Sequence, residues 1–325
     1  MMDKTLESVD SEPIAYRDAL GPRWQIRLRL FWGGFKTNWA EFTQTPIGLI
    51  GLAIILFFGL LSVAHPILMA TVWSKNVYDP VVGIDLDIPY HPSAPSARHL
   101  LGTDPLGRDV LSQLMYSARF EFGLGIMAAG MALLIATTVG ALAAYFGGWL
   151  DSVLMRLADL VIMVPAIPIL IVLSAIIADF GMLQLAVFLG ILSGFGATTI
   201  VIKSQALSVK VKPFIEAARV AGGGHTHIIT RHMVPNLLPI ALLYMMFVVT
   251  TAIFAEAILS FLGLTEIEMS WGLMINTTQV LGYILRFDTW WLLFPAALSI
   301  TLLCSAFYLV GRAMDEVVNP RLRQR

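Results

Sequence analysis

The residues most able to do chemistry in this sequence are three histidines, His225, His227 and His232, which could bind a metal ion. Residues two positions apart do not face each other on a helix. No cysteine or carboxylate lies at a useful interval beside these histidines to complete a ligand set. The pattern therefore favours a surface that touches another protein, and we expect no metal site in this chain.

Motifs that would support catalysis are missing from the sequence. It contains no Gly-x4-Gly-Lys-Ser/Thr, and no glycine is followed by lysine, so the chain has no loop of the kind that cradles the phosphates of ATP. His-Glu-x-x-His and Gly-x-Ser-x-Gly are absent as well. We predict that the chain is not an enzyme and binds no cofactor itself.

Charged residues inside apolar runs are functional candidates, because a charge in hydrocarbon is costly. Glu256 lies deepest, between two alanines, and must face protein, a water-filled path or a partner subunit. A role in a path or a subunit contact and a role in plain packing are both open for it. Arg156 and Asp159 are i, i+3 neighbours near the end of another run, which favours a structural ion pair over a gate.

A polar stretch between two long apolar segments reads PFIEAARVAGGGHTHIITRHMVP and covers Pro213 to Pro235. Proline is tolerated in the first turn of a helix, and glycine readily takes the left-handed conformation that ends one. These rules predict a short helix over Pro213–Ala221, ended by Gly222, and a second over His225–Val234, ended by Pro235. Helices this short are marginal alone, so something must hold them in place.

This stretch resembles the EAA loop of the membrane subunits of bacterial ATP-binding-cassette importers, the loop on which the ATPase subunit docks. Glu216-Ala217-Ala218, then three residues and Gly222, then twelve residues and Pro235 carry the resemblance. The family usually ends the motif with Ile or His, any residue, Leu and Pro, and it more often has Ala-Ser where this chain has Gly223-Gly224. By the resemblance, the residues that couple to the ATPase are Pro213, Glu216, Ala217, Ala218, Arg219, Gly222, His232 and Pro235.

Further blocks resemble the dipeptide and oligopeptide branch of these importers and occur in that branch's order. They are Leu101–Ser112, Ser260–Leu264, Ser270–Gly272, Phe294–Pro295 and Asn319–Arg323, so the resemblance covers about residues 101–323. It implies the permease fold of type I importers and a chain that forms half of a translocation path for peptides. The same branch includes importers of oligosaccharides and of metal chelates, which are the alternative substrates.

The resemblance also implies partners. These are a second, similar permease subunit, with a heterodimer favoured, two ATPase subunits that bind ATP and magnesium, and an extracytoplasmic substrate-binding protein. Two other classes stay open. An ion-gradient-driven secondary transporter should carry an internal repeat with broken helices, and none is found here. An intramembrane enzyme is disfavoured by the missing motifs.

Composition indicates an integral membrane protein. Of 325 residues, 57% are hydrophobic and only 13% are charged, and the mean hydropathy is +0.77. The formal net charge of −1 gives no support for nucleic-acid binding. The single cysteine, Cys304, can form no disulfide within the chain and is expected to be a small core residue.

A membrane-spanning helix needs about 20 apolar residues, and six uncharged runs of that size are present. We therefore predict an all-α protein with six transmembrane helices and both termini on one side. Of the 21 lysines and arginines, five (Lys75, Arg98, Arg108, Arg119 and Arg286) would then lie on one side and the rest on the other. The positive-inside rule places both termini in the cytoplasm. The resemblance implies that the membrane is the inner membrane of a bacterial cell. The runs are Pro46–Leu68, Phe122–Phe146, Leu154–Ala178, Leu183–Ile202, Leu238–Leu262 and Trp290–Val310.

The predicted organisation follows from these runs. Residues 1–45 form a cytoplasmic arm, residues 46–69 the first span and residues 70–119 an extracytoplasmic loop. Residues 120–312 form a permease core that contains the coupling loop 204–237, and residues 313–325 form a cytoplasmic tail.

Three local structures are expected at the edges of these segments. In the arm, Arg23, Arg27 and Arg29 alternate with apolar residues and predict a helix at the lipid headgroups, most simply an anchor. In the loop, Asp104 and Pro105 predict a helix N-cap and first position, with Asp109 in the first turns. Met269–Leu285 is too polar and short for a span and predicts a re-entrant or amphipathic piece.

Overall fold

The computed structural model describes residues 32–33, 36, 39–177 and 179–318. The chain divides into two compact units, Met1–Pro46 and Ile47–Arg325. In the described part of the first unit, the ring of Trp39 stacks on that of Phe42 at 5.8 Å. The predicted surface helix around Arg23, Arg27 and Arg29 lies outside the described residues.

The described chain is built of helices and loops, and its only strand-like pairing is one isolated bridge between Thr103 and Asp109. This confirms the predicted all-α class. The helices are α3 (Pro46–Thr71), α4 (Lys75–Tyr78), α5 (Val110–Phe146), α6 (Gly148–Met163), α7 (Ala166–Ile176), α8 (Met182–Phe195), α9 (Ala197–Lys210), α10 (Pro213–Val220), α11 (His225–Ile228), the π-helix η1 (Ile229–Met233), α12 (Val234–Phe261), α13 (Trp271–Val280), the 3-10 helix η2 (Phe287–Thr289) and α14 (Trp290–Val318).

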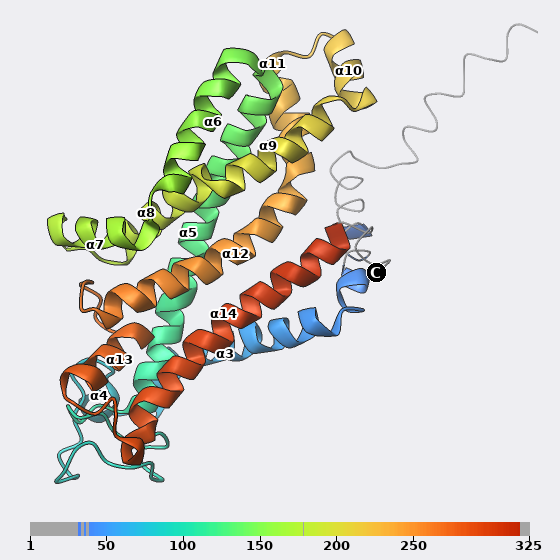
Figure 1. Cartoon of the computed structure of the whole chain (residues 1–325). Helices are drawn as coiled ribbons and strands as arrows, with labels where there is room; N and C mark the ends of the chain where they lie inside the picture. The colour runs from blue at the N-terminus through green and yellow to red at the C-terminus, as the bar shows by residue number, and fades with distance from the viewer. Residues whose placement is uncertain (1–31, 34–35, 37–38, 178, 319–325) are drawn as a thin grey trace, which may run out of the picture. The chain divides into compact units, whose positions relative to one another are not determined.

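Helices α5 and α12 organise the second unit, because both contribute buried residues to each of its three apolar clusters. Alanine is the commonest of the buried residues of α5, and its small side chain lets neighbouring backbones approach closely. Figure 1 shows α5 running from α4 and the loop beside it to α6, with α10 and α11 near the opposite end of α5.

Four helical segments are long and apolar enough to cross a membrane: α3, α5, His225–Phe261 and Phe287–Val317. Two further pairs pass the same test only together, α6 with α7 and α8 with α9. By length and composition the described chain therefore has four candidate spans, or six if each pair is one span.

The third predicted run, Leu154–Ala178, is not one straight helix. It is divided into α6 and α7, whose axes differ by 83°. Val164 and Pro165 are both extended at the break. A residue before proline is pushed out of the helical region by the proline ring, which accounts for the break. The fourth run bends by 43° at Gly196, which is also not helical.

The ion pair expected between Arg156 and Asp159 is not formed, and this expectation was wrong. Both side chains are exposed on α6. The charge on this helix that finds a partner is Asp151, whose carboxylate lies 2.5 Å from the ammonium of Lys203 on α9. The pair therefore joins two helices instead of two turns of one helix.

Helix α5 begins at Val110, twelve residues before the apolar run that predicted it. Its N-cap is Asp109, whose Oδ1 accepts a hydrogen bond from the Ser112 N–H at 2.6 Å. The expectation that Asp104 caps this helix was therefore wrong. Asp104 instead accepts from the backbone of Leu106 and Arg108 and from the Arg108 side chain, and so closes the turn before the helix.

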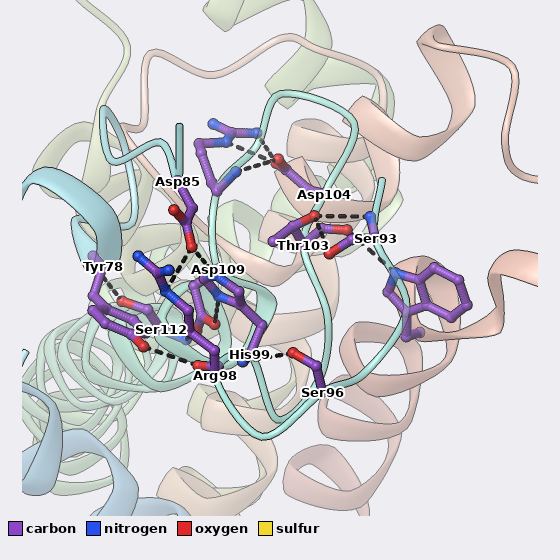
Figure 2. Close-up of polar contacts among 12 residues, drawn as sticks. Tyr78, Asp85, Ser93, Ser96, Arg98, His99, Thr103, Asp104, Asp109 and Ser112 are labelled. Atoms are coloured by element: carbon purple, nitrogen blue, oxygen red, sulfur yellow. Dashed lines mark hydrogen bonds and ion pairs between the residues drawn. The ribbon is translucent and has the colours of Figure 1, made fainter. Parts of the chain in front are cut away.

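The loop between α3 and α5, residues 72–109, is held to the start of α5 by a polar cluster around His99 (Figure 2). His99 is fully buried. Its Nδ1 lies 2.7 Å from Asp109 Oδ2 and its Nε2 lies 2.9 Å from Asp85 Oδ2. Arg98 reaches the same Asp85 oxygen at 2.7 Å. We call Asp85, Arg98, His99 and Asp109 the His99 clasp.

A second contact joins this loop to the last helix. The indole N–H of Trp291 on α14 donates to the carbonyl of Thr103 at 3.2 Å. Thr103 is itself fixed by His91, whose Nδ1 lies 2.8 Å from its hydroxyl, and its backbone N–H donates to Ser93. The loop is thus an ordered structure that is joined to both α5 and α14.

The polar stretch Met269–Leu285 forms the ten-residue α13, capped by Ser270, whose Oγ accepts from the Leu273 N–H at 3.2 Å. Trp271 is fully buried and donates from its indole to the carbonyl of Leu114 on α5 at 3.0 Å. Helix α13 is therefore packed against protein, which agrees with the expectation that it is not a span.

Candidate functional site

Helix α10 starts the candidate site as the sequence predicts. Pro213 occupies its first turn after an extended Lys212, and the helix ends at Val220. Glu216 and Arg219 form an i, i+3 ion pair with 3.3 Å between the charged atoms, and both side chains are exposed. An exposed pair at this distance contributes little to stability, so both charges are available to another molecule.

A Schellman motif ends α10. The N–H of Gly223 donates to the carbonyl of Ala218 at 2.9 Å, and the N–H of Gly222 donates to that of Arg219 at 3.0 Å. Gly222 has φ +82°, which confirms the predicted left-handed conformation. A Cβ at position 223 would lie 2.7 Å from the Ala218 carbonyl, so the second glycine also fits this tight turn.

The two faces of α10 have different environments. Ile215 is fully buried in the apolar cluster that also holds Ile228, Met233 and the last turn of α5. The opposite face, formed by Phe214, Glu216, Ala217, Arg219 and Val220, is exposed, and the side chain of Val220 is 82% exposed. We call these five residues the outer face of α10.

The second short helix does not end at Pro235, and this expectation was wrong. Helix α11 continues through the π-helical turn η1 into α12. The Val234 N–H donates to the Ile229 carbonyl, five residues back. Pro235 follows this wider turn directly, in the first turn of α12. The wider turn therefore carries the helix past the proline without a break.

The three histidines make separate contacts. His225 Nδ1 lies 2.8 Å from the Tyr145 hydroxyl, and the rings of His227 and His232 meet edge to face at 5.5 Å. The ring of His232 also lies 6.3 Å from that of Phe214, so it reaches α10. Within the part of the chain that the structure describes, no three His, Cys, Asp or Glu side chains are grouped as metal ligands.

Glu256 lies in a different part of the structure from the predicted coupling residues. It is on α12, 21 residues beyond Pro235, which is about 30 Å along a helix. The side chain is fully buried inside its own chain, and its Oε1 accepts from the Ser260 hydroxyl at 2.5 Å. Its neighbour is the equally buried Glu121 of α5. A path or subunit-contact role for Glu256 stays a prediction.

Most of the predicted coupling residues are brought together. Pro213 to Gly222 form α10 and its turn, and His232 packs on this helix through Phe214. Pro235 is exposed one turn farther along, and Ala218 is half-buried. Glu256 is not part of this group.

Sequence reasoning missed three residues that the structure places at important contacts. Glu121 was missed because the apolar run was started one residue later, at Phe122. Tyr145 and Lys210 were counted only as part of a span and as a charge, yet Lys210 Nζ donates to the Ala144 carbonyl at 2.9 Å. Because Lys210 and Ala144 are 66 residues apart in the chain, no local pattern in the sequence predicts their contact.

Comparison with known proteins confirms the resemblance. Residues 136–324 match the family model described as binding-protein-dependent transport system inner membrane component. The chain is 31% identical to the dipeptide transport system permease protein of Bacillus subtilis (strain 168), over 88% of this chain and 85% of that protein. It is 29% identical to the oligopeptide transport system permease protein of the same organism, over 89% and 90%. It is 28% identical to the dipeptide transport system permease protein of Alkalihalophilus pseudofirmus, also over 89% and 90%. The chain therefore belongs to the family of binding-protein-dependent transport system inner membrane components.

Proposed function

We propose that this chain is a permease subunit of an ATP-binding-cassette importer of peptides and forms half of its translocation path. The chain is a multi-pass inner-membrane protein, in agreement with its family and its apolar helices. The similar proteins named above are peptide permeases, and the likeness covers nearly their whole length. This is the observation that carries the peptide assignment, in preference to oligosaccharides or metal chelates.

The outer face of α10 is the docking site for the ATPase in this proposal. Its residues are exposed while Ile215 fixes the helix to the rest of the chain. Two apolar side chains, Phe214 and Val220, flank the Glu216–Arg219 pair. A helix of this kind suits a groove on another protein, because apolar residues supply buried area and the charges set the orientation.

The proposed topology has six spans, with both termini in the cytoplasm. Each bent pair then counts as one crossing, so α6 with α7 is the third span and α8 with α9 is the fourth. The excess of lysine and arginine on one side supports this orientation. So does the position of α10 and of the α3–α5 loop near opposite ends of α5 (Figure 1).

The proposed partners are a second permease subunit, most simply a different but similar chain, two ATPase subunits and an extracytoplasmic binding protein. ATP and magnesium bind to the ATPase subunits in this proposal, since the sequence has no phosphate-binding loop. The chain would then contribute the path and the surface through which hydrolysis is coupled to its opening.

The experiment is uptake of a labelled dipeptide and a labelled tetrapeptide into proteoliposomes that contain the complete complex and its binding protein. We expect uptake that requires ATP and all partners. Uptake by the lone chain driven by a proton gradient would contradict the proposal and favour a secondary transporter. Uptake of an oligosaccharide or a metal chelate, with no peptide uptake, would contradict the substrate class alone.

Docking is tested separately by photo-crosslinking. A benzoylphenylalanine at Ala217 should form an adduct with the ATPase subunit in the assembled complex. The matched control is the same residue at Val82, which is 75% exposed in the α3–α5 loop. An adduct from position 82 and none from position 217 would overturn the assignment of α10.

A further inference from the structure

Both ends of the segment that carries α10 are attached to the last turn of α5. Before α10, the ammonium of Lys210, the last residue of α9, donates to the Ala144 carbonyl at 2.9 Å. After α10, His225 Nδ1 lies 2.8 Å from the hydroxyl of Tyr145. The segment 211–224 is therefore held at both ends by contacts to two consecutive residues of α5, Ala144 and Tyr145.

The Lys210 contact is strong for its position. The last carbonyl groups of a helix have no partner within the helix, and the C-terminus carries partial negative charge. The Ala143 carbonyl accepts from the Gly147 N–H at 3.0 Å, and Lys210 supplies the donor for the next carbonyl. The ammonium group of Lys210 therefore supplies both a hydrogen-bond donor and a positive charge at this end of α5.

The Tyr145 contact is equally well placed. The ring of Tyr145 is buried, and its centroid lies 5.5 Å from that of His225. The ring of Phe146 lies 5.7 Å from the same imidazole. The first residue of α11 is therefore held by ring contacts and by one hydrogen bond to the last turn of α5.

Helix α5 is a more direct rigid link than the helices next to α10 in the sequence. It is one continuous helix of 37 residues with no internal proline, which is about 55 Å long. Helix α9 meets α8 at a 43° bend, and α12 follows a π-helical turn and contains Pro239. A displacement of α10 that is transmitted through α9 or α12 must cross these irregular points. A displacement transmitted through α5 does not.

We propose that Lys210, Tyr145 and His225 are positioning residues that join α10 to α5, so that α5 transmits the movement of the ATPase toward the other side of the membrane. This proposal rests on the proposed function. The residues touch no substrate, and they act by keeping α10 and α5 together as one body.

The test measures peptide transported per ATP hydrolysed by the complete complex in proteoliposomes. Tyr145→Phe keeps the ring and removes only the hydroxyl, and His225→Phe keeps an aromatic ring and removes the nitrogen that contacts this hydroxyl. We expect either variant to lower the transport-to-hydrolysis ratio about fivefold, the factor that corresponds to one net hydrogen bond of about 1 kcal/mol. The double variant should lower the transport-to-hydrolysis ratio no more than either single variant does, because all three lack the same hydrogen bond.

Two controls separate this role from general damage. Tyr308→Phe removes the hydroxyl of a half-exposed tyrosine on α14 that makes no hydrogen bond to any residue the structure describes, and it should leave the ratio unchanged. Lys210→Met should lower the ratio and Lys210→Arg should restore most of it, because guanidinium can still donate to the Ala144 carbonyl.

Several results would overturn the proposal. A wild-type ratio in Tyr145→Phe, or losses in the double variant that multiply those of the single ones, would show that this bond does not couple. Loss of the ATPase subunits from the Tyr145→Phe complex would assign the bond to assembly instead of coupling. If the complex that carries benzoylphenylalanine at position 217 as its only change forms no adduct with the ATPase subunit, the proposed docking of α10 fails, and that result is distinct from these.

Discussion

The side chains of Glu121 and Glu256 face each other in the buried interior between α5 and α12. Both are fully buried. Neither oxygen of Glu121 accepts a hydrogen bond from an N–H or O–H of any residue that the structure describes, and Glu256 Oε2 has no such donor either. Glu256 has one donor, the Ser260 hydroxyl, and Glu121 has none among the described residues. Two such groups repel each other when both are ionised, so the contact costs stability. A costly buried contact between acidic groups on two candidate spans is a candidate for function.

The first prediction concerns this pair. Glu121→Gln supplies an N–H donor and removes one charge, so it should raise the thermal midpoint of the purified complex. The free energy of unfolding should rise by about 1–3 kcal/mol, which is the cost of a buried polar group without a partner. Asp159→Asn is the matched control, because Asp159 is exposed, and should leave the midpoint unchanged. A lower midpoint for Glu121→Gln would mean that the carboxylates hold a bound cation or another donor.

The second prediction concerns the His99 clasp. His99→Ala leaves the buried carboxyl groups of Asp85 and Asp109 without their shared partner. Removing one member of a buried charged network costs about 3–5 kcal/mol, so residues 72–109 should become sensitive to protease added from outside. Asp87→Asn removes only an exposed partner of Arg98 and should not have this effect. Equal cleavage of both variants would show that the clasp does not hold the loop.

The third prediction concerns acid. Burial acts to raise the pKa of Asp85, but hydrogen bonds from His99 and the Asp87 N–H, with the charge of Arg98, outweigh it and lower that pKa below its ordinary value. Ionised Asp85 therefore adds stability that is complete above about pH 4 and is lost as the pH falls below it. Protease protection of the loop should fall below pH 4 in the wild type, and less steeply in Asp85→Asn.

Asp109 supplies the contrast to Asp85. Burial raises the pKa of Asp109, against the hydrogen bonds from Ser112 and His99. Its contribution is therefore complete below about pH 4 and is lost as the pH rises through its folded-state value. Asp109→Asn should abolish the loss of stability that occurs as the pH rises toward neutral. It should keep the helix N-cap, since asparagine also caps helices. Identical pH profiles for the two asparagine variants would contradict both assignments.

The fourth prediction concerns topology. A cysteine at Leu86, which is 89% exposed, should react with a membrane-impermeant maleimide in intact cells. A cysteine at Val211, which is 81% exposed, should react only after the membrane is opened. Cys304 is replaced by alanine in both variants. The reverse pattern would invert the proposed orientation and remove α10 from the cytoplasm.

Much of the fold could be predicted from the sequence, because hydrocarbon imposes simple rules on length and polarity. The apolar runs locate the long helices, and Pro213 and Gly222 locate α10 to within one residue of its observed end. The starts of helices were less predictable. Glu121 and the polar residues before it extended α5 beyond its apolar run, because their partners come from the loop and from α12.

The candidate site was predictable where its residues are neighbours in sequence. The EAA residues share one short helix, so their spacing is enough to find them. Tyr145 and His225 are 80 residues apart, and Lys210 is 66 from Ala144. Only the packing of α5 against α9 and α11 makes those pairs meet, and no local pattern records it.

The most direct test of the account uses Gly222, whose φ of +82° sets the turn after α10. A β-branched side chain costs about 1–2 kcal/mol in this conformation, although a Cβ would meet no atom within 4 Å. Gly224→Ala is the matched control, since Gly224 has φ −67° and equally open space. Glu216→Ala, which removes only an exposed charge, should have a milder effect than Gly222→Val.

The decisive measurement is the amount of labelled peptide transported per ATP hydrolysed by the reconstituted complex with Gly222→Val. We predict that this variant is inserted in the membrane at the wild-type level, and that the ratio falls severalfold while Gly224→Ala keeps it. Normal assembly of Gly222→Val together with transport at the wild-type rate would show that α10 is not the coupling element.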